Sequence, residues 1–275
     1  MTFACFSQFL RNRSDNDVKK LNKVLKKKFY SLLLLIAVSA LVSCSSSDTG
    51  NINTDDPEKA YFAAKSNYDK GDYLEAIDDF NLIKLKFSGT SIIDKSIYFL
   101  GMSYYKREEY ILAIYEFETL VKNYPSSEYS ENARFNMAMS YYKLSPAYNL
   151  DQTYSRYAIT EFQNFLDLYP DSKHARSADK RIAELKNKLA YKTYKSAELY
   201  YNLENYKAAL VYYNNILEEY FDSKYADDAL YGKIQVLIIK KMFEEAKKEI
   251  KRFEEIFTSS EFLSRVKTLK TRIPA

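Results

Sequence analysis

The sequence predicts an all-α fold in which helix pairs stack into one solenoid. From Pro57 onward, apolar residues recur at the three-to-four-residue spacing of amphipathic helices, and no stretch shows the sustained alternation of a strand. One arrangement of small and aromatic residues returns five times, and turns rich in Pro, Ser and Asp separate the copies. A single copy could not bury its own apolar face, so we expect all five to form one domain.

The second copy defines the repeat, because every expected position is filled. It has a small residue at position 8, an aromatic at 11, Tyr at 17, Ala at 20, an aromatic at 24, an apolar residue at 27 and Pro at 32: Gly101, Tyr104, Tyr110, Ala113, Phe117, Leu120 and Pro125. This is the tetratricopeptide (TPR) pattern. Small residues at 8 and 20 allow the two helices to cross closely, and the larger residues fill the space toward the next repeat.

The other copies fit the same frame. They begin at Pro57, Glu131, Ala190 and Asp227, with Ala64, Ala76 and Phe80 in the first, Ala138, Ala158 and Phe162 in the third, Ala197, Ala209 and Tyr213 in the fourth, and Ala246, Ile250 and Phe253 in the fifth. In the fifth copy Ile234 replaces the small residue at position 8, and the Trp common at position 4 is absent throughout. The sequence therefore predicts a TPR solenoid of five helix-pair repeats.

Two departures from the period are expected to change the stack locally. Eight extra residues fall between Tyr141 and Ala158, and Ser145-Pro146 predicts that they form a loop between the helices of repeat three. From His174 to Tyr201 no helix breaker occurs. This stretch predicts one long helix of roughly 28 residues, about 42 Å, that joins repeats three and four.

The N-terminus indicates export and lipid attachment. Lys26, Lys27 and Lys28 precede an apolar run, residues 29–41, which as a helix would span roughly 20 Å and is too short for a membrane span. Residues 1–43 are therefore interpreted as a signal peptide whose first part precedes the true start. Its last residues and Cys44 resemble the lipobox of bacterial lipoproteins, which implies lipidation of Cys44 and cleavage before it; an ordinary signal with a chance cysteine is the alternative. Residues 44–56 are predicted to be a flexible tether, 57–260 the solenoid and 261–275 a basic tail.

Charge and composition argue against nucleic-acid binding and catalysis. The whole chain has a pI near 8.6, but without residues 1–43 it holds 33 basic and 35 acidic residues, a formal net charge of −2. Cys44 is then the one cysteine, and His174 the one histidine, with no second His or free Cys to complete a metal or nucleophile site. The chain has five glycines and no glycine-rich phosphate loop. We expect no enzyme activity, no cofactor and no metal.

Aromatic residues predict a binding surface along the first helices of the repeats. Positions 5 and 12 point toward the concave side of a TPR solenoid, and in repeats one to three they are Tyr61, Tyr68, Tyr98, Tyr105, Phe135 and Tyr142. If largely exposed, these side chains would form a groove for apolar or aromatic peptide segments. The alternative is that they pack between helices, as we favour for Tyr194, Tyr201 and Tyr231 in the last two repeats.

The basic tail offers a second candidate site. Arg265, Lys267, Lys270 and Arg272 are interpreted either as a face that docks on a partner protein or as part of a polar capping helix that keeps the open end of the solenoid soluble.

The combination of features resembles the YfiO (BamD) family, the TPR lipoproteins of the outer-membrane β-barrel assembly machinery. The lipobox, the short tether, the five repeats, the Ser-Pro insertion in repeat three and the stretch 181–201 carry this resemblance, which covers residues 44–257. It implies an outer-membrane protein, anchored in the membrane through its lipid, with its domain in the periplasm. It also implies binding of unfolded outer-membrane protein precursors and docking on the POTRA domains of the barrel subunit. Two alternatives are a periplasmic TPR scaffold for envelope or peptidoglycan assembly and a glycan-binding outer-membrane lipoprotein.

Overall fold

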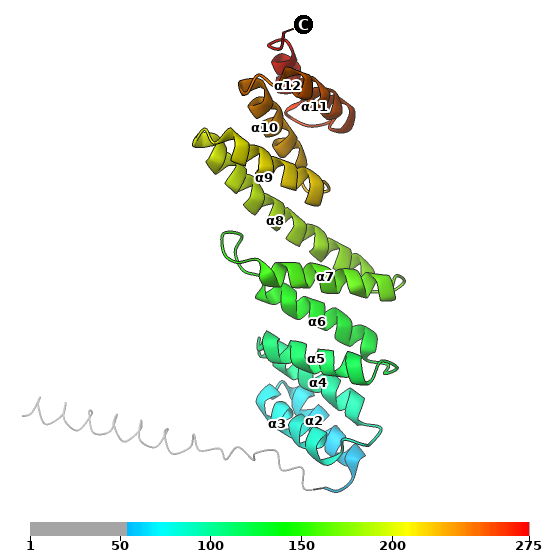
Figure 1. The fold of residues 1–275 in the computed structure, drawn as a ribbon. Helices are drawn as coiled ribbons and strands as arrows, with labels where there is room; N and C mark the ends of the chain where they lie inside the picture. The colour runs from blue at the N-terminus through cyan, green and yellow to red at the C-terminus, as the bar shows by residue number, and fades with distance from the viewer. Residues whose placement is uncertain (1–53, 275) are drawn as a thin grey trace, which may run out of the picture. The chain divides into compact units, whose positions relative to one another are not determined.

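The structure is a computed structural model that describes residues 54–274 (Figure 1). Within this range the chain forms eleven helices and no strand, so the fold is all-α. The expected signal peptide, the lipidation site Cys44 and most of the expected tether lie outside the described residues.

The helices pair as the repeat frame predicts. The pairs are α2 (Pro57–Lys70) with α3 (Tyr73–Lys86), α4 (Ile93–Lys106) with α5 (Tyr110–Asn123), α6 (Ser130–Leu144) with α7 (Thr153–Leu168), the second half of α8 (Ala175–Asn202) with α9 (Tyr206–Glu219), and α10 (Ala226–Ile239) with α11 (Phe243–Ile256). Each helix packs on the next one along the chain, and the first helices α2, α4 and α6 also contact one another. The five-repeat TPR solenoid is confirmed.

The small residues of the repeat are buried where two helices cross. Gly101 of α4 lies against Phe117 of α5, so closely that a Cβ atom on the glycine would stand 2.7 Å from Cε1 of the ring. Repeat five has no small residue at position 8, and its glycine lies elsewhere in the first helix. Ile234 occupies position 8 and is fully buried, while Gly232, two residues earlier, leaves room for the Tyr213 ring of repeat four.

Both departures from the repeat period occur where the sequence places them. Helix α8 runs through 28 residues without interruption, and the loop 145–152 separates α6 from α7. The loop is held on α8 by two lysines. Lys188 donates to Ser145 Oγ and to the Pro146 carbonyl oxygen at 2.9 Å, and Lys192 donates to the Leu150 carbonyl oxygen at 2.6 Å.

The turn inside each ordinary repeat needs a left-handed residue at position 15. Gly71 has φ +89° there, and Glu108, Glu204 and Lys241 adopt φ values of 64°, 56° and 58° at the same position. The residue after each closes the helix, as when the Asp72 amide donates to the Asn67 carbonyl oxygen at 3.0 Å. Only the first repeat uses glycine, so three repeats hold side chains in a conformation that costs about 1 kcal/mol each.

In repeats two, three and five the turn that follows the second helix is held by a serine at position 34. Ser127 Oγ donates to Asp94 of the preceding first helix at 2.6 Å and accepts from the amide of Tyr129 at 3.1 Å. The same hydroxyl-to-acid bond recurs in two further repeats, from Ser172 to Glu131 and from Ser260 to Asp227. These serines close the turn rather than cap the next helix, since the residue before α6 makes no side-chain cap bond.

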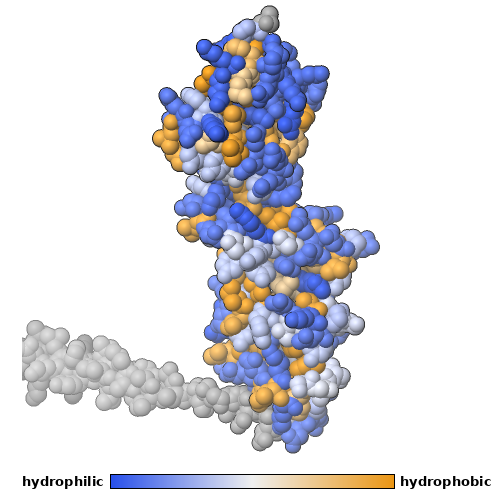
Figure 2. Space-filling model, in the orientation of Figure 1, coloured by the Kyte–Doolittle hydropathy of each residue, from blue (hydrophilic) through white to orange (hydrophobic). Residues whose placement is uncertain are grey.

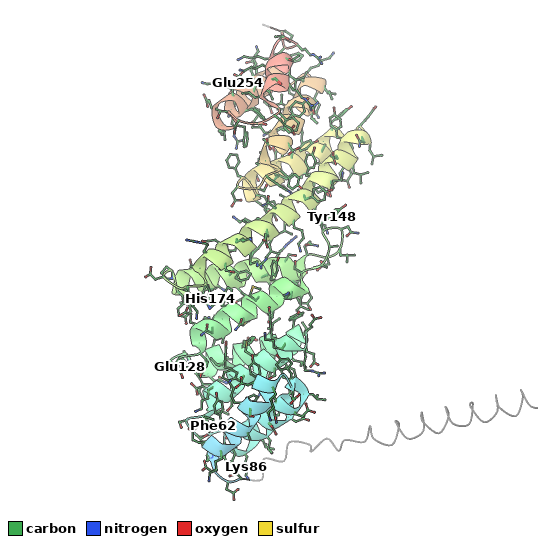
Figure 3. The ribbon with its side chains drawn as sticks, turned by 180° about the vertical axis from the view of Figure 1, so that it is seen from behind. Phe62, Lys86, Glu128, Tyr148, His174 and Glu254 are labelled. Carbon is green, nitrogen blue, oxygen red and sulfur yellow. The ribbon has the colours of Figure 1, made fainter. Side chains whose placement is uncertain are left out.

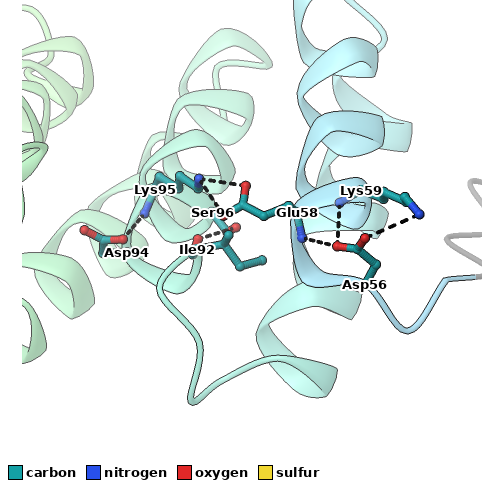
Figure 4. Close-up of polar contacts among 7 residues, drawn as sticks. All are labelled: Asp56, Glu58, Lys59, Ile92, Asp94, Lys95 and Ser96. Atoms are coloured by element: carbon teal, nitrogen blue, oxygen red, sulfur yellow. Dashed lines mark hydrogen bonds and ion pairs between the residues drawn. The ribbon is translucent and has the colours of Figure 1, made fainter.

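The first helix has the best-formed cap. The Asp56 carboxylate accepts from the amides of Glu58 and Lys59 at 3.0 and 3.3 Å, which satisfies amides at the start of α2 (Figure 4). Lys95 of the next first helix reaches back to Glu58 at 3.2 Å and so links repeats one and two.

The second helices of repeats one and two carry buried carboxylates at position 23. Glu116 is only 4% exposed and lies 2.7 Å from the ammonium of Lys84 on α3. Burial raises the pKa of Glu116, and the bond from Lys84 opposes that rise. Asp79 is equally buried and accepts from Asn67 Nδ2 at 2.8 Å.

Residues 261–275, taken above as a tail, include the helix α12 (Leu263–Lys270). Val266 is fully buried, and Leu263, Leu269 and Ile273 pack on the core of repeats four and five. On the side that Figure 2 draws, α11 and α12 present a mostly hydrophilic surface. The helix therefore covers the end of the apolar core, as a polar capping helix would.

Candidate peptide-binding surface

The position-5 aromatics do not form an open ladder. Tyr61 is only 7% exposed and packs beside Phe80 and Phe99, while Tyr98 and Phe135 are partly buried. Burial strongly raises the pKa of Tyr61. These side chains are not largely exposed; they pack between helices, which is the alternative given above.

Each position-5 ring, from repeat two onward, stacks on the residue that precedes the next first helix. The ring centroids are 4.8 Å apart for Tyr98 and Tyr129, 4.3 Å for Phe135 and His174, 5.9 Å for Tyr194 and Tyr225, and 4.8 Å for Tyr231 and Phe262. These pairs join successive repeats, and aromatic contacts of this kind stabilise beyond the area they bury.

His174 has a packing role in this series (Figure 3). Its ring stacks on Phe135 at an interplanar angle of 15°, and its Nε2 lies 3.2 Å from Asn132 Oδ1. Burial, with a smaller contribution from Lys173, lowers the pKa of His174, so the ring is neutral at pH 7. A neutral, stacked imidazole fits the interpretation of a structural histidine.

The position-12 tyrosines are partly buried, as Tyr98 and Phe135 are. Tyr68 packs edge-on against Tyr73 and Phe99 with ring centroids 5.6 and 5.2 Å apart, and Tyr105 packs edge-on against Tyr110 at 5.4 Å. Burial raises the pKa of Tyr68 to about 12. These phenols therefore stay protonated at neutral pH and can both donate and accept hydrogen bonds.

Tyr142, the third position-12 tyrosine, belongs to a polar cluster with α8. The Arg181 guanidinium lies over its ring at 4.6 Å and donates to its hydroxyl at 3.0 Å. The Tyr142 hydroxyl donates to Glu184 at 2.9 Å, and Arg181 pairs with Glu184 at 2.8 Å. Arg181 thus orients both the ring and the carboxylate.

A cavity of about 250 Å³ opens beside this cluster. It is lined by Tyr142, Lys143, Ser145, Glu184, Leu185 and Lys188. Burial lowers the pKa of Lys188, whose ammonium is bonded to Ser145 and to the Pro146 carbonyl oxygen. The cavity combines an aromatic wall with charged groups of both signs, and its size suits one side chain of a bound peptide.

The sequence frame predicted Tyr142 as a site residue but missed its partners. Arg181, Glu184 and Lys188 follow one another along α8 at spacings of three and four residues, which places them on one helix face. That spacing is visible in the sequence. What it does not reveal is that this face of α8 lies against α6.

The comparison with protein families decides the membership of the chain. The model of the YfiO family, described as an outer membrane lipoprotein, matches residues 53–252. This chain belongs to the YfiO family. Its membership confirms the resemblance proposed from the sequence, associates the protein with the outer membrane, and makes it a TPR scaffold of the lipoprotein type.

Solved TPR structures show distant likeness to this YfiO-family chain. A TPR repeats protein from Bacteroides fragilis is 14% identical, with 80% of this chain and 84% of that chain covered and a TM-score of 0.39. A thermophilic TPR protein of Thermus thermophilus is 12% identical, with 78% and 98% covered and a TM-score of 0.34. The Rap conjugation gene regulator of plasmid pLS20, solved with the Phr* peptide, is 16% identical, with 88% and 67% covered and a TM-score of 0.33. The search of curated proteins gave no match.

Residues 54–274 contain neither a helix suited to span a membrane nor a cluster suited to hold a metal ion. No helix in this range is long and apolar enough to cross a membrane. Within the same residues no cluster of His, Cys, Asp and Glu side chains could hold a metal ion.

The four basic residues of the C-terminal candidate site do not lie together. Arg265 and Arg272 line one cavity of about 230 Å³ together with Tyr231, Gln235, Thr268 and Leu269. Lys270 turns toward α11 and pairs with Glu254 at 3.0 Å. Arg265 also lies over the Phe262 ring at 5.5 Å. Two of the four cations therefore share a cavity with the last position-5 ring, and Lys267 and Lys270 do not line it.

Proposed function

We propose that this YfiO-family protein is the TPR lipoprotein of the outer-membrane β-barrel assembly machinery. In this role it is anchored by lipid at Cys44, with its domain in the periplasm, and it has no catalytic activity. It binds unfolded outer-membrane protein precursors and docks on the POTRA domains of the barrel subunit. The family match over residues 53–252 is the observation that carries this proposal.

The anchor is supported by the sequence around Cys44. The apolar run and the lipobox-like Leu41-Val42-Ser43 precede a cysteine that no other cysteine of the mature chain could pair with. Several acyl chains on one residue hold a protein on a membrane where a single chain would not. We expect Cys44→Ala to leave an uncleaved precursor, and a normally processed, membrane-bound variant would contradict the anchor.

The peptide groove is supported by the position-12 tyrosines and the cavity beside Tyr142. Their neutral phenols offer apolar area together with a hydroxyl that can bond to an extended backbone. The position-5 rings stack between repeats, so we assign them to supporting the groove rather than to contacting the peptide. This narrows the proposed contact set to Tyr68, Tyr105 and Tyr142.

A pair of triple variants tests this assignment. Tyr68, Tyr105 and Tyr142 are each changed to Ala in one protein, and Tyr61, Tyr98 and Phe135 in the other. Affinity for a fluorescent peptide from the last strand of a β-barrel precursor is measured by anisotropy, and stability by thermal melting. Each lost aromatic contact is expected to reduce binding by about 1–2 kcal/mol.

The two variants should separate binding from packing. The position-12 variant should lose affinity while most of its stability remains, and the position-5 variant should melt at a clearly lower temperature. Unchanged affinity in the folded position-12 variant would refute the groove.

The proposed docking face is tested by replacing Arg265 and Arg272 with Ala, with Lys267→Ala as the control, and measuring copurification of the POTRA-containing barrel subunit. Copurification of cell-wall enzymes in place of the barrel subunit would overturn the assembly role.

A further inference from the structure

In repeats two, three and five the residue at position 6 contacts the preceding repeat. In repeat two the Phe99 ring lies 5.2 Å from Tyr68 and 6.3 Å from Phe80, both in repeat one. In repeat three Asn136 Nδ2 donates to the Tyr98 hydroxyl at 3.2 Å. In repeat five the place of a Cβ on Gly232 is occupied by the Tyr213 ring of repeat four. Position 6 is therefore a rear-facing contact position in these three repeats, whereas in repeat four it holds Lys195, which is exposed and pairs with Glu198 of the same helix.

In repeat one the same position holds an exposed phenylalanine. Phe62 is 64% exposed, since the described chain has no repeat before it. The neighbouring rear-facing positions 7 and 10 are Ala63 and Ser66, both exposed, whereas their counterparts Leu100 and Ser103 in repeat two are fully buried. The first repeat thus presents an uncovered face in which the one large side chain is aromatic.

A second apolar side chain is exposed in the same repeat. Leu85 of α3 is 82% exposed, the highest value among the large apolar side chains of the described residues. It stands at position 29, which in the other four repeats holds the exposed charged residues Lys122, Asp167, Glu218 and Glu255. Single exposed apolar side chains are common on protein surfaces. Here two of them occupy positions where the other repeats place either a covered or a charged residue.

The tether enters the domain at this repeat. Thr54 and Asp55 are held by Lys86, the neighbour of Leu85: its ammonium pairs with Asp55 at 2.7 Å and donates to the Thr54 carbonyl oxygen at 3.1 Å. Figure 3 shows Phe62 and Lys86 at the same end of the ribbon. Only ten residue steps separate Thr54 from Cys44, so even a fully extended chain would span about 35 Å.

We propose that Phe62 and Leu85 insert into the surface of the bilayer that carries the lipid anchor. This inference rests on the lipidation of Cys44 proposed above. The short tether keeps repeat one close to that bilayer, and an aromatic and an aliphatic side chain beside lysines suit the boundary between headgroups and acyl chains. Lys59 and Lys86 lie near the two apolar residues in the sequence, where they pair with Asp56 at 3.4 Å and with Asp55 at 2.7 Å. At the other end of the described residues, α12 packs on the core of repeats four and five.

Tryptophan reporters can test this contact, because the natural chain contains no Trp. Phe62→Trp and Leu85→Trp are each introduced into the full-length protein, which is processed in cells and reconstituted into vesicles. Leu203→Trp serves as a matched control, because Leu203 is 65% exposed and lies at the end of α8 in repeat four. Emission and quenching by lipids brominated along the acyl chain are measured for all three proteins, and vesicle flotation is measured in parallel.

The expected result is blue-shifted, strongly quenched emission for the two reporters in repeat one and unquenched emission for the control. Unquenched emission from Phe62→Trp and Leu85→Trp in proteins that float with the vesicles would overturn the inference. A blue shift that depends on protein concentration and not on lipid would also overturn it. Such a shift would show that this face is covered by a second copy of the protein or by another helix. Failure of all three proteins to float would instead refute the lipid anchor, and the inference would fall with it.

Discussion

The replacement of Gly101 by alanine separates two effects that act in opposite directions. Gly101 lies within α4, where alanine is intrinsically favoured over glycine by about 1 kcal/mol. A solvent-exposed helix would therefore be stabilised by this change. In this structure the added Cβ would meet Cε1, Cδ1 and Cζ of Phe117 at 2.7, 2.9 and 3.1 Å.

The steric effect should be the larger one. Phe117 is fully buried between α4 and α5, so its ring cannot move aside without disturbing Leu120 and the other core residues around it. Overpacking a core typically costs about 1–3 kcal/mol, which exceeds the gain in helix propensity. We expect Gly101→Ala to lower the free energy of unfolding by about 1 kcal/mol, or about 2–4 °C in melting temperature for a domain of this size.

Thermal melting and urea unfolding of Gly101→Ala and three comparison variants would measure this. Gly89→Ala is the control, because a Cβ there has no neighbour within 4 Å, and its stability should be unchanged. Phe117→Leu in the Gly101→Ala background should cost less than Phe117→Leu alone, because the smaller side chain relieves the clash. A Gly101→Ala variant that is more stable than the natural protein would show that the helices do not cross this closely.

Three further predictions concern charge and backbone strain. Lys84→Met should destabilise the domain by about 3 kcal/mol because it leaves Glu116 buried without its partner, and adding Glu116→Leu should recover most of that loss in urea unfolding. The pKa of Asp228 is raised to about 6, by burial first and then by Asp227 and other carboxylates. The stability that the protonated Asp228 carboxyl contributes is therefore present below about pH 4 and is lost as the pH rises through 6. Asp228→Asn should therefore raise stability at pH 7 by about 1 kcal/mol and flatten the pH dependence of the melting temperature; an unchanged slope would contradict the assignment. Glu204→Gly should stabilise the domain by about 1 kcal/mol, since φ is 56° at this position, although glycine usually destabilises; a lower melting temperature would refute that account.

The fold could be predicted in detail because its determinants are local. Small residues at positions 8 and 20 and aromatics at 24 mark helix crossings within one repeat, and the absence of a breaker between His174 and Tyr201 predicted a helix that the structure places at Ala175–Asn202. The eight extra residues of repeat three also fall in a loop as expected. Each of these inferences depends on the chain within about forty residues.

The burial of the position-5 aromatics was harder to predict, although the sequence contains a signal for it. Tyr98 and Tyr129 are thirty-one residues apart, as are Tyr194 with Tyr225 and Tyr231 with Phe262. The predicted groove rests on the first helices alone, whereas each of these rings is reached by a residue of the following turn. The cluster of Tyr142 with Arg181 has no comparable signal, because it depends on the angle at which α8 crosses α6.

Helix α8 has a consequence for any ligand of the proposed groove. In ordinary repeats a turn separates one repeat from the next. Here Lys188, which lines the cavity of repeat three, and Tyr194, which stacks on Tyr225 in repeat four, stand on one continuous helix and are separated by about 9 Å along its axis. The loop 145–152 is bonded to the same helix through Lys188 and Lys192. A peptide that enters the cavity beside Tyr142 would therefore meet repeats three and four at a fixed spacing, whereas its contacts with Tyr68 and Tyr105 cross repeat boundaries that contain turns. Selectivity for a particular residue of the peptide is accordingly expected at the cavity, and tolerance of varied sequences at the first two tyrosines.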